Sequence, residues 1–114
     1  DIYPTVAELA DVEVPRDLEG KSLVPLIHDP LDAWDRPAFT QVQFKKNQQA
    51  YPGRAVRTER WRYVEWDGGK AGHELYDHRN DPEEMRNLAA EPAQSKVVKQ
   101  MRTLLRSNFA KRSP

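Results

Sequence analysis

Cysteine is absent from this chain of 114 residues. Its absence excludes disulfides, thiolate zinc sites and a cysteine nucleophile within the chain. A surplus of either charge is also absent, since 18 lysines and arginines balance 18 aspartates and glutamates to a formal net charge of zero. Without a basic surplus there is no electrostatic reason to expect a nucleic-acid or anionic-membrane partner, and we expect neither.

Long apolar runs are missing as well. No stretch approaches the ~18 apolar residues of a membrane span, and the first ten residues lack the basic and apolar regions of a signal peptide. The chain opens without methionine, on DIYPT, which is typical of a helix start. We therefore expect a fragment of a longer protein, with room for one modest core.

The N-terminal third predicts a short helix and an irregular connector. Pro4 suits the first position of a helix over 3–11, whose apolar side chains recur at helical spacing. Four prolines then make long regular elements unlikely between Val12 and Pro37. A single helical turn over 22–27 is expected to bury Leu23, Leu26 and Ile27.

The middle of the chain predicts about four antiparallel strands. Residues 38–44 alternate with period two and form the first strand, while 45–53, closing on Pro-Gly, reads as an exposed loop. Residues 54–66 predict a hairpin around Thr58–Arg60. After a turn at 67–70, residues 73–76 predict the last strand.

The C-terminal part predicts helices that cover the sheet. Asp81, Pro82 and Glu84 have the spacing of a helix start, from which Met85 and Leu88 would pack onto the sheet. A second helix follows Glu91-Pro92, with one apolar stripe comprising Val97, Val98, Met101, Leu104, Leu105 and Phe109. The fold class is therefore α+β: a small antiparallel sheet of about four strands packed against a C-terminal helix, with a short N-terminal helix and an irregular connector.

Motifs for autonomous chemistry are incomplete. Gly20-Lys21-Ser22 resembles the end of a phosphate-binding loop, but Pro15 stands where the first glycine is required. His73 and His78, five apart in an extended segment, are poorly placed to share a metal, and the acids between 77 and 84 lack the spacing of a calcium loop. No serine stands in a nucleophile-elbow pattern. We expect no catalytic residue and no metal ligand in this chain.

One cluster of basic residues is a candidate anion site. Lys45 and Lys46 in the expected loop, with Arg54 and Arg57 in the hairpin, could bind a sulfate or carboxylate, which guanidinium groups match with two hydrogen bonds. The alternative is a charged outer sheet face balanced by Glu59, Glu65 and Asp67. We favour it, because charged residues usually lie on the exposed face of a sheet, where opposite charges pair.

Four segments in order give the chain a family resemblance. They are DIYPT at 1–5, LEGKSL at 18–23, VRT at 56–58 leading to Tyr63, and LYD at 75–77 with Asp81-Pro82, Glu84 and Asn87-Leu88. Together they resemble the C-terminal subdomain of the type I sulfatases, nearest the iduronate-2-sulfatase-like branch of the alkaline phosphatase superfamily. The resemblance covers nearly the whole chain.

The resemblance implies a sulfuric ester hydrolase whose chemistry lies upstream. Family members use a formylglycine, made from Cys or Ser in a C/S-x-P-x-R motif, and a calcium ion; neither the motif nor the calcium ligands occur here. Residues 1–37 would join the missing catalytic domain, and 38–114 would be the subdomain that supports it and forms one wall of the cleft for a sulfated sugar. The resemblance also implies a periplasmic, secreted or lysosomal parent.

Two other functions stay open at this point. A free-standing carbohydrate- or protein-binding module would display Trp34, Trp61, Tyr63 and Trp66 as a platform. A phosphodiesterase or phosphonate hydrolase would carry the same subdomain. Separated from its partner, the N-terminal third would expose Ile2, Val6, Leu9, Leu23 and Leu26, so we expect self-association or poor order there.

Overall fold

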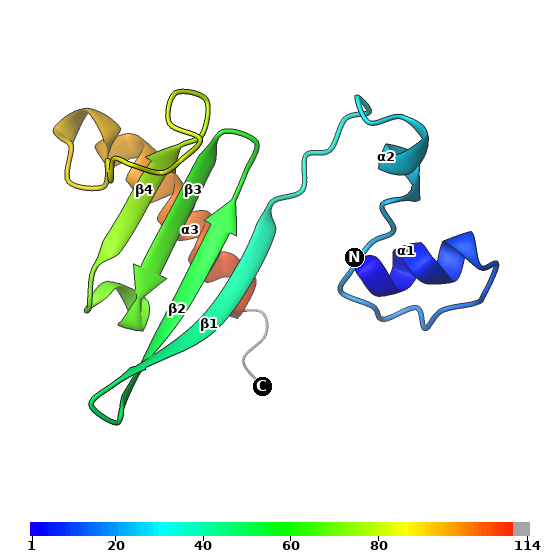
Figure 1. Cartoon of the computed structure of the whole chain (residues 1–114), viewed down its shortest axis with the longest axis horizontal. Helices are drawn as coiled ribbons and strands as arrows, with labels where there is room; N and C mark the ends of the chain where they lie inside the picture. Colours follow the sequence, from blue (N-terminus) through cyan, green and yellow to red (C-terminus); the bar gives the residue numbers. More distant parts are fainter. Residues whose placement is uncertain (111–114) are drawn as a thin grey trace. The chain divides into compact units, whose positions relative to one another are not determined.

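The computed structural model describes residues 1–110, which form two compact units, Asp1–Trp34 and a second beginning at Asp35. Figure 1 shows the elements. The first unit holds the helices α1 (Ile2–Leu9) and α2 (Val24–His28). The second holds the strands β1 (Ala38–Lys46), β2 (Gln49–Arg57), β3 (Trp61–Trp66) and β4 (His73–Asp77), the short 3-10 helices η1 (Asp67–Gly69) and η2 (Pro92–Gln94), and the helix α3 (Ser95–Ala110).

The first unit is built around the start of α1. Thr5, which is buried, accepts a hydrogen bond from the Leu23 backbone N–H at 2.8 Å through its hydroxyl oxygen, and the Asp1 carboxylate accepts one from Lys21 at 2.7 Å. A Cβ at Gly20 would lie 2.6 Å from the Asp1 nitrogen, so only glycine permits this approach. The DIYPT and LEGKSL segments therefore contact each other.

Two details of this unit differ from the prediction. The helical turn buries Val24, whereas Leu23 and Leu26 are half-buried and Ile27 is 56% exposed. In α1 the buried side chains are Thr5 and Ala7. Ile2, Val6 and Leu9 are exposed, as expected for the separated unit.

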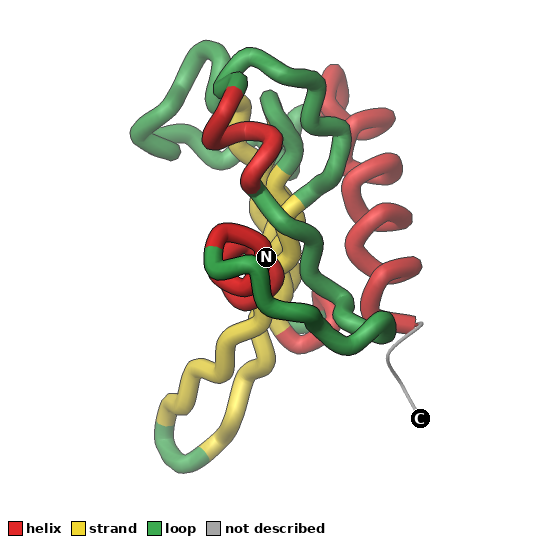
Figure 2. The backbone as a smooth tube through the Cα atoms, turned by 90° about the vertical axis from the view of Figure 1, so that its right-hand side faces the viewer, coloured by secondary structure: helices red, strands yellow, loops and turns green. Residues whose placement is uncertain are grey.

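The four strands form one antiparallel sheet in the order β1-β2-β3-β4. The register places Val56 opposite Tyr63, and Tyr63 opposite Leu75, so these three share one face. Helix α3 lies along that face (Figures 1 and 2). The predicted α+β fold is confirmed.

The core lies between this face and α3. All four of its largest fully buried side chains, Val56, Tyr63, Leu75 and Leu105, are less than 2% exposed. Val98, Met101 and Phe109 complete the cluster, with Val97, Leu104 and Leu88 packed at its margin. The helical stripe predicted for α3 is confirmed residue by residue.

The predicted loop over 45–53 is wrong. Strand β1 continues through Lys46, and β2 begins at Gln49, so only Asn47 and Gln48 form the turn, both with positive φ. That backbone matches the twist of a two-residue hairpin. Pro52 lies inside β2, in the part that pairs with β1 but not with β3, where a missing N–H costs no bond to a third strand.

The helix predicted to start at Asp81 is also wrong. The Asp81 carboxylate accepts hydrogen bonds from the backbone N–H groups of Met85 and Arg86, which closes a turn. Glu84 has a φ of 56°, and Met85 is 84% exposed and does not pack onto the sheet. Leu88 does reach the core, because its N–H donates to the Leu75 carbonyl oxygen.

Candidate functional site

The predicted anion site divides in the structure, because its four basic residues stand at different points of the β1–β2 hairpin. Lys45 and Lys46 are exposed at the hairpin end, where they pair with Ala50 and Gln49. Arg57 pairs with Ala38 at the other end of the strands, seven residues or about 23 Å from Lys45 along β1. A single small anion could not contact both ends.

The two arginines have partners of their own. Arg54 lies on the α3 side, with its guanidinium carbon 4.5 Å from the centre of the Phe109 ring. Arg57 donates hydrogen bonds to the carbonyl oxygens of Thr58 and Glu59, the latter at 2.9 Å. These contacts stabilise the helix and the β2–β3 turn respectively, so the lysines at the hairpin end are the more available cations.

The expected balancing acid Glu65 is not on an outer face. It is 4% exposed on the α3 side, where Arg106 donates two hydrogen bonds to its carboxylate at 3.0 and 3.2 Å. Tyr63 donates its hydroxyl proton to the same carboxylate and accepts from Arg102. Burial raises the pKa of Tyr63, so its phenol stays a neutral donor. The cluster fastens α3 to β3.

The acids considered for calcium serve the fold as well. Asp77 accepts two hydrogen bonds from Arg60, at 2.7 and 2.9 Å, and one from the Asn80 amide. The bond from Arg60 holds the pKa of Asp77 well below its usual range. Glu84 pairs with Arg62 and with His78, so the segment after β4 is fixed to β3 by charge.

The aromatic platform of a free-standing module is absent. Tyr63 is fully buried, and Trp61 packs against the core cluster. Trp66 stands instead on the opposite sheet face, where it borders an open hollow of about 600 Å³. The hollow is lined by Phe44, Lys46, Tyr51, Trp66, Ala71 and Glu74. The hollow is not evident from the sequence, because a loop over 45–53 would not place Tyr51 opposite Phe44, as strand β2 does.

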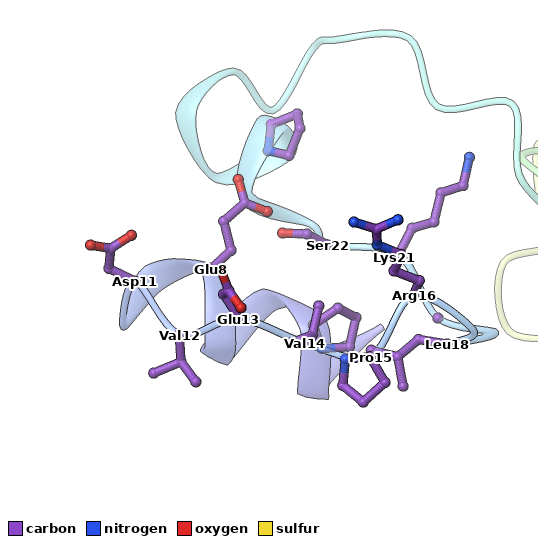
Figure 3. A pocket seen from close by; sticks show the side chains of 13 residues that line it. Glu8, Asp11, Val12, Glu13, Val14, Pro15, Arg16, Leu18, Lys21 and Ser22 are labelled. Carbon is purple, nitrogen blue, oxygen red and sulfur yellow. The ribbon is translucent and has the colours of Figure 1, made fainter.

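The first unit has a larger hollow of about 680 Å³ between α1 and the connector (Figure 3). The acidic side chains Glu8 and Asp11 lie at one side of the view, and Arg16 and Lys21 at the other. Its walls include Val12, Val14 and Pro15, on an exposed segment. This mixture selects neither an anion nor a cation.

The histidine and acidic side chains of residues 1–110 are spread along the chain. In this part of the chain, no three His, Asp or Glu side chains gather as a metal would require. His73 lies against the Tyr63 ring and His78 pairs with Glu84, in separate surroundings. None of the helices described is long and apolar enough to cross a membrane.

Comparison with known proteins identifies this arrangement. A family model described as "N-sulphoglucosamine sulphohydrolase, C-terminal" matches residues 1–111. A Delta 4,5-hexuronate-2-O-sulfatase of Bacteroides thetaiotaomicron is 35% identical over 106 residues, which are 92% of this chain and 22% of the relative. A solved 2-O GAG sulfatase superposes with a TM-score of 0.83 at 32% identity, over 97% of this chain and 24% of that one.

A phosphonate monoester hydrolase of Agrobacterium radiobacter also superposes, with a TM-score of 0.68 at 26% identity, over 97% of this chain and 24% of that one. The sulfatases and this hydrolase therefore share the subdomain. The chain spans about a fifth to a quarter of the relatives it matches.

Proposed function

Since the chain belongs to the C-terminal domain family of N-sulphoglucosamine sulphohydrolase, we propose that it serves a sulfatase as a supporting subdomain. In this proposal the parent protein hydrolyses a sulfate ester of a sugar, and residues 38–114 brace its catalytic domain and form one wall of the substrate cleft. Residues 1–37 connect the two. The observation that carries the proposal is the family match along residues 1–111.

The substrate class follows from the nature of the relatives. The relatives include a hexuronate-2-O-sulfatase and an N-acetylglucosamine-6-O-sulfatase, and the solved structures include a 2-O GAG sulfatase. The substrate we propose is a sulfated sugar, and one that contains a uronic acid is the first to test. Such a substrate carries sulfate and carboxylate groups, which lysine side chains attract. Lys45 and Lys46, exposed at the hairpin end, are the residues that we propose to contact the substrate. Arg54 and Arg57 remain candidates, although they already contact Phe109 and the Glu59 carbonyl oxygen respectively.

The calcium ion and the formylglycine implied by the family resemblance are assigned to the preceding part of the parent. The residues described here do not fit the metal, since no group of three His, Asp or Glu side chains is present among them. The chain also lacks the C/S-x-P-x-R motif from which formylglycine would form. In the proposal this chain contributes binding and shape, and bond cleavage is assigned to the rest of the parent.

A phosphonate or phosphodiester hydrolase is the second candidate, favoured by the superposition on the phosphonate monoester hydrolase. The two candidates differ in the group transferred, sulfuryl or phosphoryl, and we assign the nucleophile to the rest of the parent. Assaying the full-length protein with a sulfated disaccharide and with a phosphonate monoester distinguishes them. The sulfatase proposal expects a higher kcat/KM for the sulfated sugar, and the reverse order would contradict it.

The wall of the cleft is tested by substituting Lys45→Ala and Lys46→Ala in the full-length protein. We expect kcat/KM on a sulfated disaccharide to fall about tenfold for the pair, equivalent to about 1.4 kcal/mol. Added salt should narrow the difference, since the lysines are exposed. Lys96→Ala, an exposed lysine on α3, is the matched control. Unchanged kcat/KM after both hairpin substitutions would remove these lysines from the cleft.

A further inference from the structure

The sheet has a second face that α3 does not cover. Along β1 this face carries Val42 and Phe44, which are 49% and 54% exposed. The register places Val42 opposite Gly53, Gly53 opposite Trp66, and Phe44 opposite Tyr51. We call this set, Val42, Phe44, Tyr51 and Trp66 around Gly53, the open-face patch.

The composition of the patch is not typical of a solvent-exposed sheet face. Antiparallel sheets with one solvated face alternate apolar residues inward with polar residues outward. Here four outward positions, Val42, Phe44, Tyr51 and Trp66, are aliphatic or aromatic, whereas Lys46 and Gln49 at the hairpin tip are polar. The middle of β3 is buried on both faces, since Val64 is 5% exposed on one and Tyr63 0% on the other. The open-face patch is therefore an apolar area within a face of mixed composition.

One group of charged side chains on this face lies at its opposite end, while Lys46 and Glu74 border the hollow itself. Arg62 bonds Glu84 there, and Arg57 bonds the β2–β3 turn, so the segment after β4 already occupies that end. The patch is left open between this charged end and the hairpin tip. In Figure 2 the hairpin tip bends to the side away from α3.

The orientation of the Trp66 ring in the patch is fixed by its neighbours. The Trp66 indole N–H donates to Glu74 at 3.0 Å, and the Tyr76 hydroxyl donates to the other oxygen of the same carboxylate at 3.0 Å. One side of the indole lies against Gly53, where any Cβ would be 2.5 Å from a ring carbon. A fixed aromatic ring beside a hollow of about 600 Å³ is the arrangement that centres of protein interfaces use to receive a partner side chain.

We propose that the open-face patch is the surface on which the catalytic part of the parent sulfatase docks, with an apolar side chain of that part entering the hollow beside Trp66. This inference rests on the proposed function, because it presumes the parent. The matched region is 22% of the hexuronate-2-O-sulfatase and 24% of the GAG sulfatase, so most of each relative is available to cover the face. Burial of exposed aromatic and aliphatic area drives such docking.

The test compares two forms of the protein. Phe44→Ser and Val42→Ser are each introduced into the 114-residue chain and into the full-length protein. In the 114-residue chain both side chains are about half exposed, so the Tm should move by less than about 1 °C. In the full-length protein the same substitutions should lower the Tm by about 3 °C or more, and should speed proteolytic cleavage within residues 29–37.

Met85→Ser is the matched control, since Met85 is an apolar residue 84% exposed outside the patch, and it should change neither form. Equal Tm losses in both forms, or no loss in either, would overturn the docking proposal. So would a loss of kcat/KM on the sulfated disaccharide with an unchanged full-length Tm, which would make the patch a sugar-binding surface. If Phe44→Ser destabilises only the full-length protein while Lys45→Ala and Lys46→Ala keep kcat/KM, docking stands and the cleft-wall role fails.

Discussion

Among single residues, Gly53 has the strictest steric requirement in the sheet. Its φ is not positive, so the backbone itself would accept another residue. The constraint comes from Trp66, whose ring carbons would lie 2.5, 2.8 and 3.0 Å from a Cβ at this position. The glycine therefore permits close packing of the indole, whose N–H donates to Glu74.

Gly53→Ala should consequently destabilise the 114-residue chain by about 1–3 kcal/mol, the range for overpacking. Urea unfolding followed by fluorescence measures the change. In a Trp66→Leu background the smaller side chain leaves room for the methyl group, so the cost should fall below about 0.5 kcal/mol. An equal cost in both backgrounds would show that Trp66 is not the cause.

At the scale of elements, the periodicity of apolar residues predicts the strands and the helix whose apolar side chains form the core. The alternation in 38–44 and 54–66 and the stripe on α3 were sufficient for four strands and their covering helix, because each pattern is imposed by burial on one face. The turn at Asn47–Gln48 was missed because it lacks the Asn-Gly signal of such turns, while Pro52-Gly53 gives a false one. Glycine and proline there serve packing and strand pairing instead.

The segment after β4 was mispredicted for a different reason. Its local spacing is that of a helix start, but tertiary hydrogen bonds replace the helical ones. Asn87 accepts from the Leu75 and Ala89 N–H groups, and the Leu88 N–H donates to Leu75. Glu84, expected to bond the start of its own helix, pairs with Arg62 and His78. The two partners of Glu84 are 6 and 22 residues away in the sequence, which is beyond what a local pattern can reveal.

The ion pair at the start of this segment makes it sensitive to acid. Because the pKa of Asp77 is lowered in the fold, its carboxylate stabilises the native state above the unfolded pKa of about 3.9, and the contribution is lost as pH falls toward the lower folded pKa. Asp77→Asn should therefore lower the Tm at pH 7, and the difference from the unsubstituted chain should narrow below about pH 4. Thermal unfolding between pH 7 and pH 2 measures it.

Glu83→Gln, an exposed acid in the same turn, serves as the control and should leave the Tm unchanged at pH 7. A constant Tm difference between Asp77→Asn and the unsubstituted chain from pH 7 to pH 2 would show that the Asp77 charge does not contribute.

The sequence predicted only part of the candidate site. The basic residues of the hairpin were identified from composition, but their separation along it required the register.

In the whole molecule, stability is distributed unequally between the two units. The buried core cluster belongs entirely to the second unit. The first unit buries only Thr5, Ala7 and Val24 among its 34 residues, and chains below about 40 residues seldom build a sufficient core. The cooperative unfolding transition of the 114-residue chain should therefore report the sheet and α3.

Deleting residues 1–34 tests this distribution. The remaining chain, 35–114, should keep the Tm of the 114-residue chain within about 2 °C, because every side chain of the core cluster is retained. A peptide of residues 1–34 should unfold without a cooperative transition, since its helices are only eight and five residues long. A fall of more than about 5 °C on deletion would mean that the first unit stabilises the second. The sheet would then depend on the connector as well as on its own core.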